Sequence, residues 1–191
     1  MADDSDNLDT PELSTERLRL RPLRPSDAAE MFAYRSDPEV ARYQGWQPAS
    51  LDQVSSFIEE RLEAPFGVDG EWCQLAITLA DGSLIGDCGL HFLKEGPGQM
   101  ELGITLARHA QGHGYATETI RALLRLLFEG LGKHRVIARI DPRNGPSVAL
   151  FTRVGMRREA HHVESYWFRG EWADDVVFAM LRREFHHVRG Q

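Results

Sequence analysis

The sequence has only two cysteines, no long apolar run and no excess of positive charge. Cys73 and Cys88 lack the spacing of a metal site, so we expect reduced, buried thiols, which are typical of a reducing compartment. No run approaches the about 20 apolar residues that a membrane helix needs. The acidic residues 1–12 lack the basic and apolar regions of a secretion signal. These absences predict a cytoplasmic protein without a membrane partner.

The net charge of −7 argues against a nucleic-acid partner, and an acidic surface would suit a cationic amine. A Gly-Lys-Ser/Thr sequence is missing, which excludes a Walker-type kinase. Two histidine pairs fall in or beside predicted strands, where neighbouring side chains point to opposite faces, so no metal site is expected. These pairs are His161-His162 and His186-His187.

The remaining composition is that of a globular domain. Of 191 residues, 42% are hydrophobic and 27% are charged, enough to bury a substantial core. Neither an internal repeat nor a linker divides the chain. We expect a mobile N-terminal tail over residues 1–12 and a single domain over residues 13–191.

Hydrophobic periodicity and turn residues predict the order of elements. It is a strand, two helices, three antiparallel strands, a helix, a strand, a helix and two strands, at about 17–23, 27–35, 50–64, 72–79, 83–93, 99–106, 115–128, 136–140, 145–154, 158–168 and 174–182. Asp27 with Glu30 predicts a capping box, and Asp81-Gly82 predicts a hairpin turn. A helix between the fourth and fifth strands implies a parallel crossover. The predicted class is therefore α+β, a mixed α/β fold.

A glycine turn lies between the strand at 99–106 and the following helix. Its sequence is Gln111-Gly112-His113-Gly114-Tyr115-Ala116. Two glycines permit a tight turn and leave room for a ligand near the backbone. The unpaired N–H groups of the helix's first turn favour an anion there. This turn predicts a phosphate or pyrophosphate site.

Five phrases in the same order resemble the GNAT N-acetyltransferases, and within them the RimJ/RimL-like branch that acetylates ribosomal proteins. They are Ser14-Thr15-Glu16-Arg17-Leu18-Arg19-Leu20-Arg21, Glu101-Leu102-Gly103-Ile104, Gln111 to Glu118, Asn144 and Ser147 ahead of Gly155-Met156, and Gly170-Glu171-Trp172-Ala173-Asp174. The resemblance covers roughly residues 14–185. It implies the GNAT acyl-CoA N-acyltransferase fold, with a central, mostly antiparallel sheet, a splayed parallel pair at its fourth and fifth strands, and helices on both faces.

The resemblance also implies acetyl-CoA as co-substrate, with no metal. The backbone of the glycine turn would hold the pyrophosphate, with the His113 side chain facing solvent. The pantetheine arm would lie along the strand and beside the next helix. The predicted cofactor-binding residues are thus Ile104, Thr105, Leu106, Gln111, Gly112, His113, Gly114, Tyr115, Ala116, Asn144, Ser147 and Phe151.

Glu101 and Ser147 are the candidate catalytic residues. Strand alternation puts Glu101 on the face opposite Met100 and Leu102. The resemblance implies that an acid near this position draws a proton from the amine, commonly through water. Alternatively, Glu101 is a structural carboxylate paired with an arginine. Many GNAT enzymes have a tyrosine at the position of Phe151 to protonate the thiolate. Ser147 is the best remaining hydroxyl, ahead of Tyr115 and Tyr166, unless it only caps the helix.

The expected reaction is acetyl transfer to a primary amine by direct attack in a ternary complex. The acceptor is a protein N-terminus or a small-molecule amine. Its pocket would be lined by Tyr43, Trp46, Trp167 and Trp172. The resemblance leaves a homodimer open.

Two other readings compete with this enzyme. One is a non-catalytic acyl-CoA-binding or regulatory module on the same fold, which Phe151 keeps open. The other is a dinucleotide-binding oxidoreductase, because Gly112-x-Gly114-x-x-Thr117 approaches the fingerprint of that class. The antiparallel strands before the motif argue against the latter.

Overall fold

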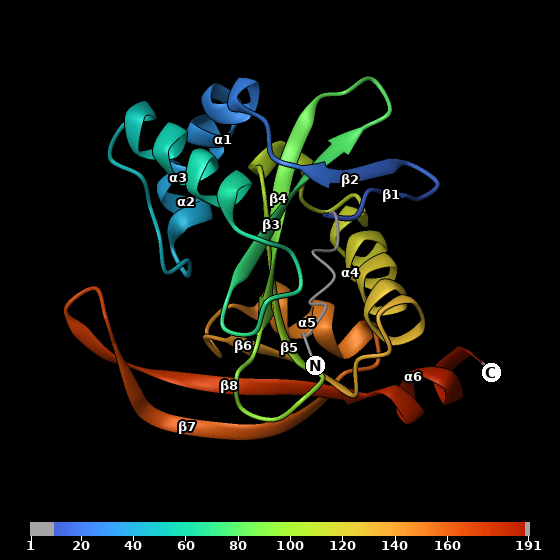
Figure 1. Ribbon diagram of the computed structural model, residues 1–191. Coiled ribbons are helices and arrows are strands. Elements are labelled where there is room, and N and C mark those ends of the chain that lie inside the picture. The colour runs from blue at the N-terminus through green and yellow to red at the C-terminus, as the bar shows by residue number, and fades with distance from the viewer. Residues whose placement is uncertain (1–9, 190–191) are drawn as a thin grey trace, which may run out of the picture.

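The computed structural model describes residues 10–189, with side chains up to Phe185, so most of the predicted tail at 1–12 lies outside the described residues. One sheet of eight strands forms the centre, in the order β1-β2-β3-β4-β5-β6-β8-β7 (Figure 1). Its strands are β1 Leu13–Ser14, β2 Leu18–Pro22, β3 Trp72–Leu79, β4 Leu84–Phe92, β5 Gln99–Leu106, β6 Arg135–Ile140, β7 Arg157–Phe168 and β8 Glu171–Leu181.

The strand pairing confirms the predicted α+β class. All neighbouring strands run antiparallel except β5 and β6, which are joined through a helix. This arrangement lacks the doubly wound parallel sheet of the dinucleotide-binding class, so that alternative is wrong.

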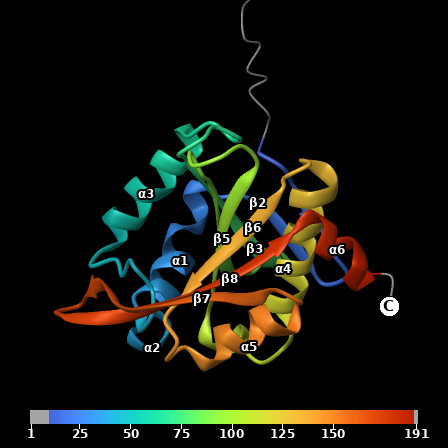
Figure 2. The ribbon, with the colours of Figure 1, turned by 90° about the horizontal axis from the view of Figure 1, so that it is seen from below.

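Helices cover both faces of the sheet (Figures 1 and 2). One face carries α1 Ala28–Arg35, α2 Pro38–Ala41 and α3 Leu51–Glu63. The other carries α4 Tyr115–Arg125, which continues as a π-helical turn over Leu126–Gly130, and α5 Gly145–Arg153. Short 3-10 turns occupy Pro25–Asp27 and Arg108–Ala110, and α6 spans Arg182–Arg189.

Two hydrophobic clusters bind these layers together. The larger cluster packs α4 and α5 on the sheet, with Ile120, Leu124 and Leu150 among its members. The smaller packs α1 and α3 on the opposite face, around Met31 and Ile58. Burial of apolar side chains at helical spacing on α4 and alternating spacing on β2 is what the sequence predicted.

The parallel pair β5/β6 separates along its length. Only Gln99, Met100 and Glu101 pair with β6, opposite Arg135, Val136 and Ile137. The remaining residues of β5, up to Leu106, pair only with β4. This divergence confirms the predicted splay and opens the sheet beside the glycine turn.

Two local predictions are wrong. Asp27 does not cap α1, because its carboxylate accepts hydrogen bonds from the backbone N–H of Arg24 and the guanidinium of Arg21, while Glu30 accepts one from the N–H of Leu84. The second histidine pair is not on a strand, since residues 182–189 form α6. The first error arises because the neighbouring Arg21 and Arg24 and the distant Leu84 take up the two carboxylates.

Candidate functional site

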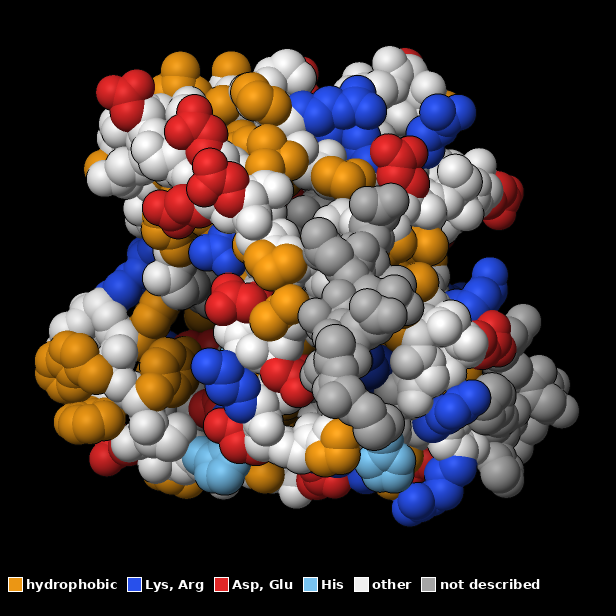
Figure 3. Space-filling view, viewed as in Figure 1, with side chains coloured by type: hydrophobic (Ala, Val, Ile, Leu, Met, Phe, Trp, Pro, Cys, Tyr) orange, Lys and Arg blue, Asp and Glu red, His pale blue; other side chains and the backbone are white. Residues whose placement is uncertain are grey.

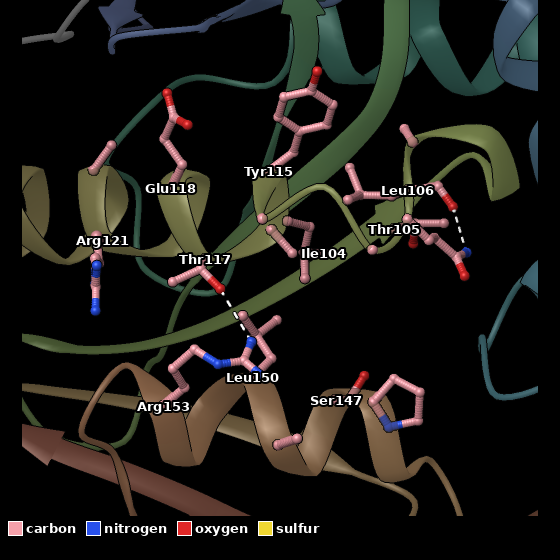
Figure 4. Close-up of a pocket in the computed structure, with 18 of the residues that line it drawn as sticks. Ile104, Thr105, Leu106, Tyr115, Thr117, Glu118, Arg121, Ser147, Leu150 and Arg153 are labelled. Atoms are coloured by element: carbon pink, nitrogen blue, oxygen red, sulfur yellow. Dashed lines mark hydrogen bonds between the residues drawn. The ribbon is translucent and has the colours of Figure 1, made fainter.

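A cavity of about 1510 Å³ lies between α4, α5 and the diverging end of β5 (Figure 4). Its wall combines segments far apart in sequence: β1 and the turn after it, the end of α2, the end of β5, the glycine turn, α4 and the start of α5. Of the predicted cofactor-binding residues, those that line it are Ile104, Thr105, Leu106, Gln111, Gly112, Gly114, Tyr115, Ala116, Asn144 and Ser147.

The glycine turn presents bare backbone to this cavity. Gly112 and Gly114 have φ of 79° and 82°, in the left-handed region that favours glycine. A Cβ added at Gly112 would meet no atom within 4 Å. Gly114 is the N-cap of α4 and supplies no side-chain cap, so the first N–H groups of the helix keep their capacity to bind an anion.

Side-chain contacts of Gln111 and His113 hold the glycine turn. The Gln111 side-chain amide donates to the carbonyl of Leu106 at 3.0 Å. The exposed His113 ring contacts the carbonyl of Gln111 at 2.8 Å and stacks on Tyr115, with 5.7 Å between ring centroids. His113 is not part of the cavity wall, so only its backbone belongs to the turn.

The end of β5 forms the inner wall. The labelled side chains of Ile104, Thr105 and Leu106 lie beside the gap between α4 and α5 (Figure 4). The Thr105 hydroxyl donates to the side-chain carbonyl of Gln44 at 3.0 Å, and both residues line the cavity. This contact joins the inner end of the cavity to the segment after α2.

Asn144 and Ser147 lie at the start of α5, but their local roles differ from one another. The side-chain Oδ1 of Asn144 accepts from the N–H of Ser147 at 3.2 Å, so Asn144 is the helix cap and Ser147 is not. The Ser147 hydroxyl points toward the gap (Figure 4). Phe151, one turn later, is buried in the larger cluster against Phe178 and does not line the cavity.

Glu101 sits at the fork of the splay, in the last residue pair between β5 and β6. Its carboxylate lies 3.8 Å from the Arg139 guanidinium and 4.0 Å from the His91 ring, so it has the basic neighbours that the structural reading required. Burial raises the pKa of Glu101; Arg139 and His91 oppose the rise, and Asp175 adds to it. Glu101 does not line the large cavity.

A buried charged cluster next to the site was not predicted from sequence. Asp87 is fully buried on β4 opposite Thr105, and it accepts hydrogen bonds from Tyr34 at 2.6 Å, from Arg35 and from Gln74. These donors satisfy both carboxylate oxygens, which leaves Asp87 a structural role. An aspartate between two glycines in an apolar strand was the only signal of this cluster.

The aromatic residues expected around the amine separate into three places. Tyr43 lines the cavity, and Trp46 stacks on Phe57 in the smaller cluster. Trp167 and Trp172 are 61% and 59% exposed at the β7–β8 hairpin, where Figure 3 shows a group of hydrophobic side chains. The hairpin tip meets α2 through the Arg169 guanidinium, which donates to the Ala41 carbonyl at 3.0 Å.

Among the described side chains, up to Phe185, no group of three or more His, Cys, Asp or Glu residues could hold a metal ion. Within residues 10–189, no helix is long and apolar enough to cross a membrane.

Comparison with known sequences places this geometry in a family. The sequence pattern described as "Acetyltransferase (GNAT) domain" matches residues 17–157. The uncharacterized N-acetyltransferase p20 of Bacillus licheniformis is 29% identical over 175 residues, which cover 91% of this chain and 97% of that protein. The alanine N-acetyltransferase of ribosomal protein uS5 from Shigella flexneri is 24% identical and covers 88% of this chain and 89% of its own.

Solved structures share the same architecture. A GNAT acetyltransferase from Bacillus anthracis has a TM-score of 0.81 at 25% identity and covers 91% of this chain and 99% of its own. The spermidine N-acetyltransferase of Vibrio cholerae, solved with CoA and spermine, has a TM-score of 0.77 at 21% identity, with 90% and 99% of the two chains covered. The chain belongs to the GNAT acetyltransferase family.

Proposed function

We propose that this protein transfers the acetyl group of acetyl-CoA to a primary amine. The observation that carries the proposal is the cavity between a bare helix N-terminus and the end of β5 that has separated from β6. One end suits a pyrophosphate and the other suits the acyl end of an extended arm. Family membership supports the same donor and the same class of reaction.

The donor would bind by its backbone contacts. N–H groups from Gln111 to Ala116 would hold the pyrophosphate, and the free edge of β5 from Ile104 to Leu106 would pair with the amides of the pantetheine arm. Asn144 and Ser147 would face that arm from α5. Phe151 supports the larger cluster from behind and is too buried to be a direct contact.

The reaction would be a direct attack. The amine nitrogen attacks the thioester carbonyl carbon, the C–S bond breaks, and the CoA thiolate leaves with or without a proton from Ser147. Glu101 would take the proton released by the amine, through water. Its position at the fork and its raised pKa both suit a general base, although its basic neighbours limit that rise.

The acceptor would be a protein N-terminus or a small amine. Relatives act at both kinds of acceptor, as their names state: one on alanine of ribosomal protein uS5 and one on spermidine. An α-amino group has a pKa of about 8, against about 10.4 for a lysine side chain, so an N-terminus requires less assistance from a base. This favours the N-terminal acceptor. The cytoplasmic location and the homodimer stay predictions.

Release of free CoA thiol tests the proposal. The purified full chain is incubated with acetyl-CoA and a panel of amines that includes N-terminal peptides of ribosomal proteins and polyamines. We expect amine-dependent thiol release and an acceptor heavier by one acetyl group. Binding of CoA without turnover on any amine would instead indicate a non-catalytic module.

A further inference from the structure

The segment Thr15-Glu16-Arg17 runs past the start of α4, and its contacts there reach the glycine turn from behind. The Arg17 guanidinium donates from Nε to a Glu118 carboxylate oxygen at 2.7 Å and lies 2.6 Å from the same oxygen through a second nitrogen. Its third nitrogen donates to the carbonyl of His113 at 3.0 Å. One side chain therefore joins α4 to the residue between the two left-handed glycines.

Glu118 accepts two further hydrogen bonds from the same segment. Its second carboxylate oxygen accepts from the Thr15 hydroxyl at 2.5 Å and from the Arg17 N–H at 2.9 Å. Partial burial opposes ionisation, but the hydrogen bonds from Thr15 and Arg17 outweigh it and lower the pKa of Glu118. The carboxylate is thus ionised and shared by three donors.

The two glycines of the turn have few neighbours. A Cβ added at Gly112 would meet nothing within 4 Å, and one added at Gly114 would meet only an Arg17 nitrogen, at 3.4 Å. Arg17 also lies over the Tyr115 ring, 4.7 Å from its centroid. Because glycine is the least restricted residue, a turn with two glycines needs outside contacts to keep one conformation.

We propose that Thr15, Arg17 and Glu118 form a brace that holds the glycine turn in the conformation that binds the CoA pyrophosphate. The brace rests on the proposed function. Glu118 and Tyr115 point away from the gap between α4 and α5, whereas Thr117 and Arg121 point into it (Figure 4). All three border the cavity, but their polar atoms are engaged with one another and with the His113 carbonyl, so we assign them as positioning residues, which act on the ligand through the backbone of the turn.

For Glu118→Gln, electrostatics alone and the brace predict opposite changes in CoA affinity. Removing a carboxylate near an anion-binding turn should strengthen binding of an anion if the effect is purely electrostatic. Under the brace, Glu118→Gln weakens the hold on Arg17 and so weakens binding. Glu16→Gln is the matched control. Glu16 also lines the cavity and is exposed, and its substitution removes the same charge without removing a contact of the brace.

The experiment measures CoA affinity by calorimetry in the wild type, Glu118→Gln, Glu16→Gln and Arg17→Met. We expect the dissociation constant to rise about tenfold for Glu118→Gln and Arg17→Met, as for loss of a charge-assisted hydrogen bond, and to stay level or fall for Glu16→Gln. Turnover of S-acetylpantetheine, which lacks the pyrophosphate, should not change in any variant. Unaltered or tighter CoA binding by Glu118→Gln, or an equal loss with S-acetylpantetheine, would overturn the brace.

Amide hydrogen exchange without ligand gives a second measurement. Glu118→Gln and Arg17→Met should speed exchange at residues 112–116 at an unchanged melting temperature, and Glu16→Gln should not. Equal exchange in all variants would also refute the brace. Failure of the wild type to bind CoA would refute the proposed function alone, since the exchange result does not depend on CoA.

Discussion

At the scale of single residues, position relative to the sheet separates the two catalytic candidates. Ser147 faces the donor cavity, whereas Glu101 lies at the fork beside Arg139 and His91. Direct attack needs groups on both sides of the thioester. Their placement on opposite sides of the splay is therefore what the proposed reaction requires.

Glu101→Gln should lower kcat about 100-fold, as expected for loss of a general base, with CoA affinity unchanged. In the wild type, kcat/KM should fall as pH drops through the raised pKa of Glu101. The folded state binds this proton more tightly than the unfolded chain does, so ionised Glu101 destabilises the fold. The melting temperature of Glu101→Gln at neutral pH should therefore not be lower. A stable variant with full activity would leave Glu101 a purely structural role.

Ser147→Ala should have a smaller effect. CoA thiolate is a tolerable leaving group near neutral pH, and Asn144 rather than Ser147 caps α5. We expect kcat to fall less than about tenfold and the melting temperature to stay within a few degrees. Parallel measurements on Glu101→Gln calibrate the comparison. A larger loss in Ser147→Ala than in Glu101→Gln would reverse the assigned importance of the two residues.

At the scale of elements, regular periodicity predicted well and long-range contacts did not. β5 and α3 follow their alternating and helical apolar patterns, and the Ser50 side chain caps α3 at the predicted start of this helix. The capping box at Asp27 was wrong because the neighbouring Arg21 and Arg24 engage Asp27, and the strand placement of His186-His187 was wrong because the chain turns into α6 after Leu181. Likewise, ten predicted cofactor-binding residues line the cavity, while the brace and the Asp87 cluster depend on partners dozens of residues away.

The junction of β5 and α4 gives a prediction about the donor. Gly114→Asp places a charge near the proposed pyrophosphate site and a side chain at φ of 82°, with its Cβ close to Arg17. We expect CoA affinity to fall at least about tenfold. Calorimetry measures it, with Gly82→Asp, in the β3–β4 hairpin turn away from the cavity, as the matched control for the same backbone strain. Equal affinity of Gly114→Asp and the wild type would refute the phosphate site.

The corner where β6, β7 and α6 meet gives a prediction about acid stability. Hydrogen bonds from Arg135 and Arg157 lower the pKa of Glu159 to about 2. The unfolded chain binds this proton more tightly, so the cluster stabilises the fold above pH of about 4.5 and loses that contribution as pH falls towards 2. Urea unfolding over this range should show a smaller loss of stability in Glu159→Gln than in the wild type. Identical pH dependence would show that the pairs contribute nothing.

At the scale of the whole molecule, one sheet carries helices on both faces and the cavity at the end of β5. Helices α4 and α5 cover the face beside the cavity, and α1 to α3 with the β7–β8 hairpin lie toward the opposite face (Figures 1 and 2). The Arg169 guanidinium links this hairpin to the Ala41 carbonyl of α2 and to the Gln47 side chain. The eight-stranded sheet thus holds the helices of both faces in place around the core.

Because β5 and β6 share only three residue pairs, the sheet is open between these strands beyond Glu101. Under the proposed function, acetyl-CoA fills the cavity and the amine approaches from the side of Glu101, so both substrates can occupy the enzyme together and neither has to depart before the other enters. Initial rates at varied acetyl-CoA and amine concentrations should therefore give intersecting double-reciprocal lines. Parallel lines, the signature of a covalent acetyl-enzyme, would mean that the donor leaves before the amine binds and would overturn direct attack.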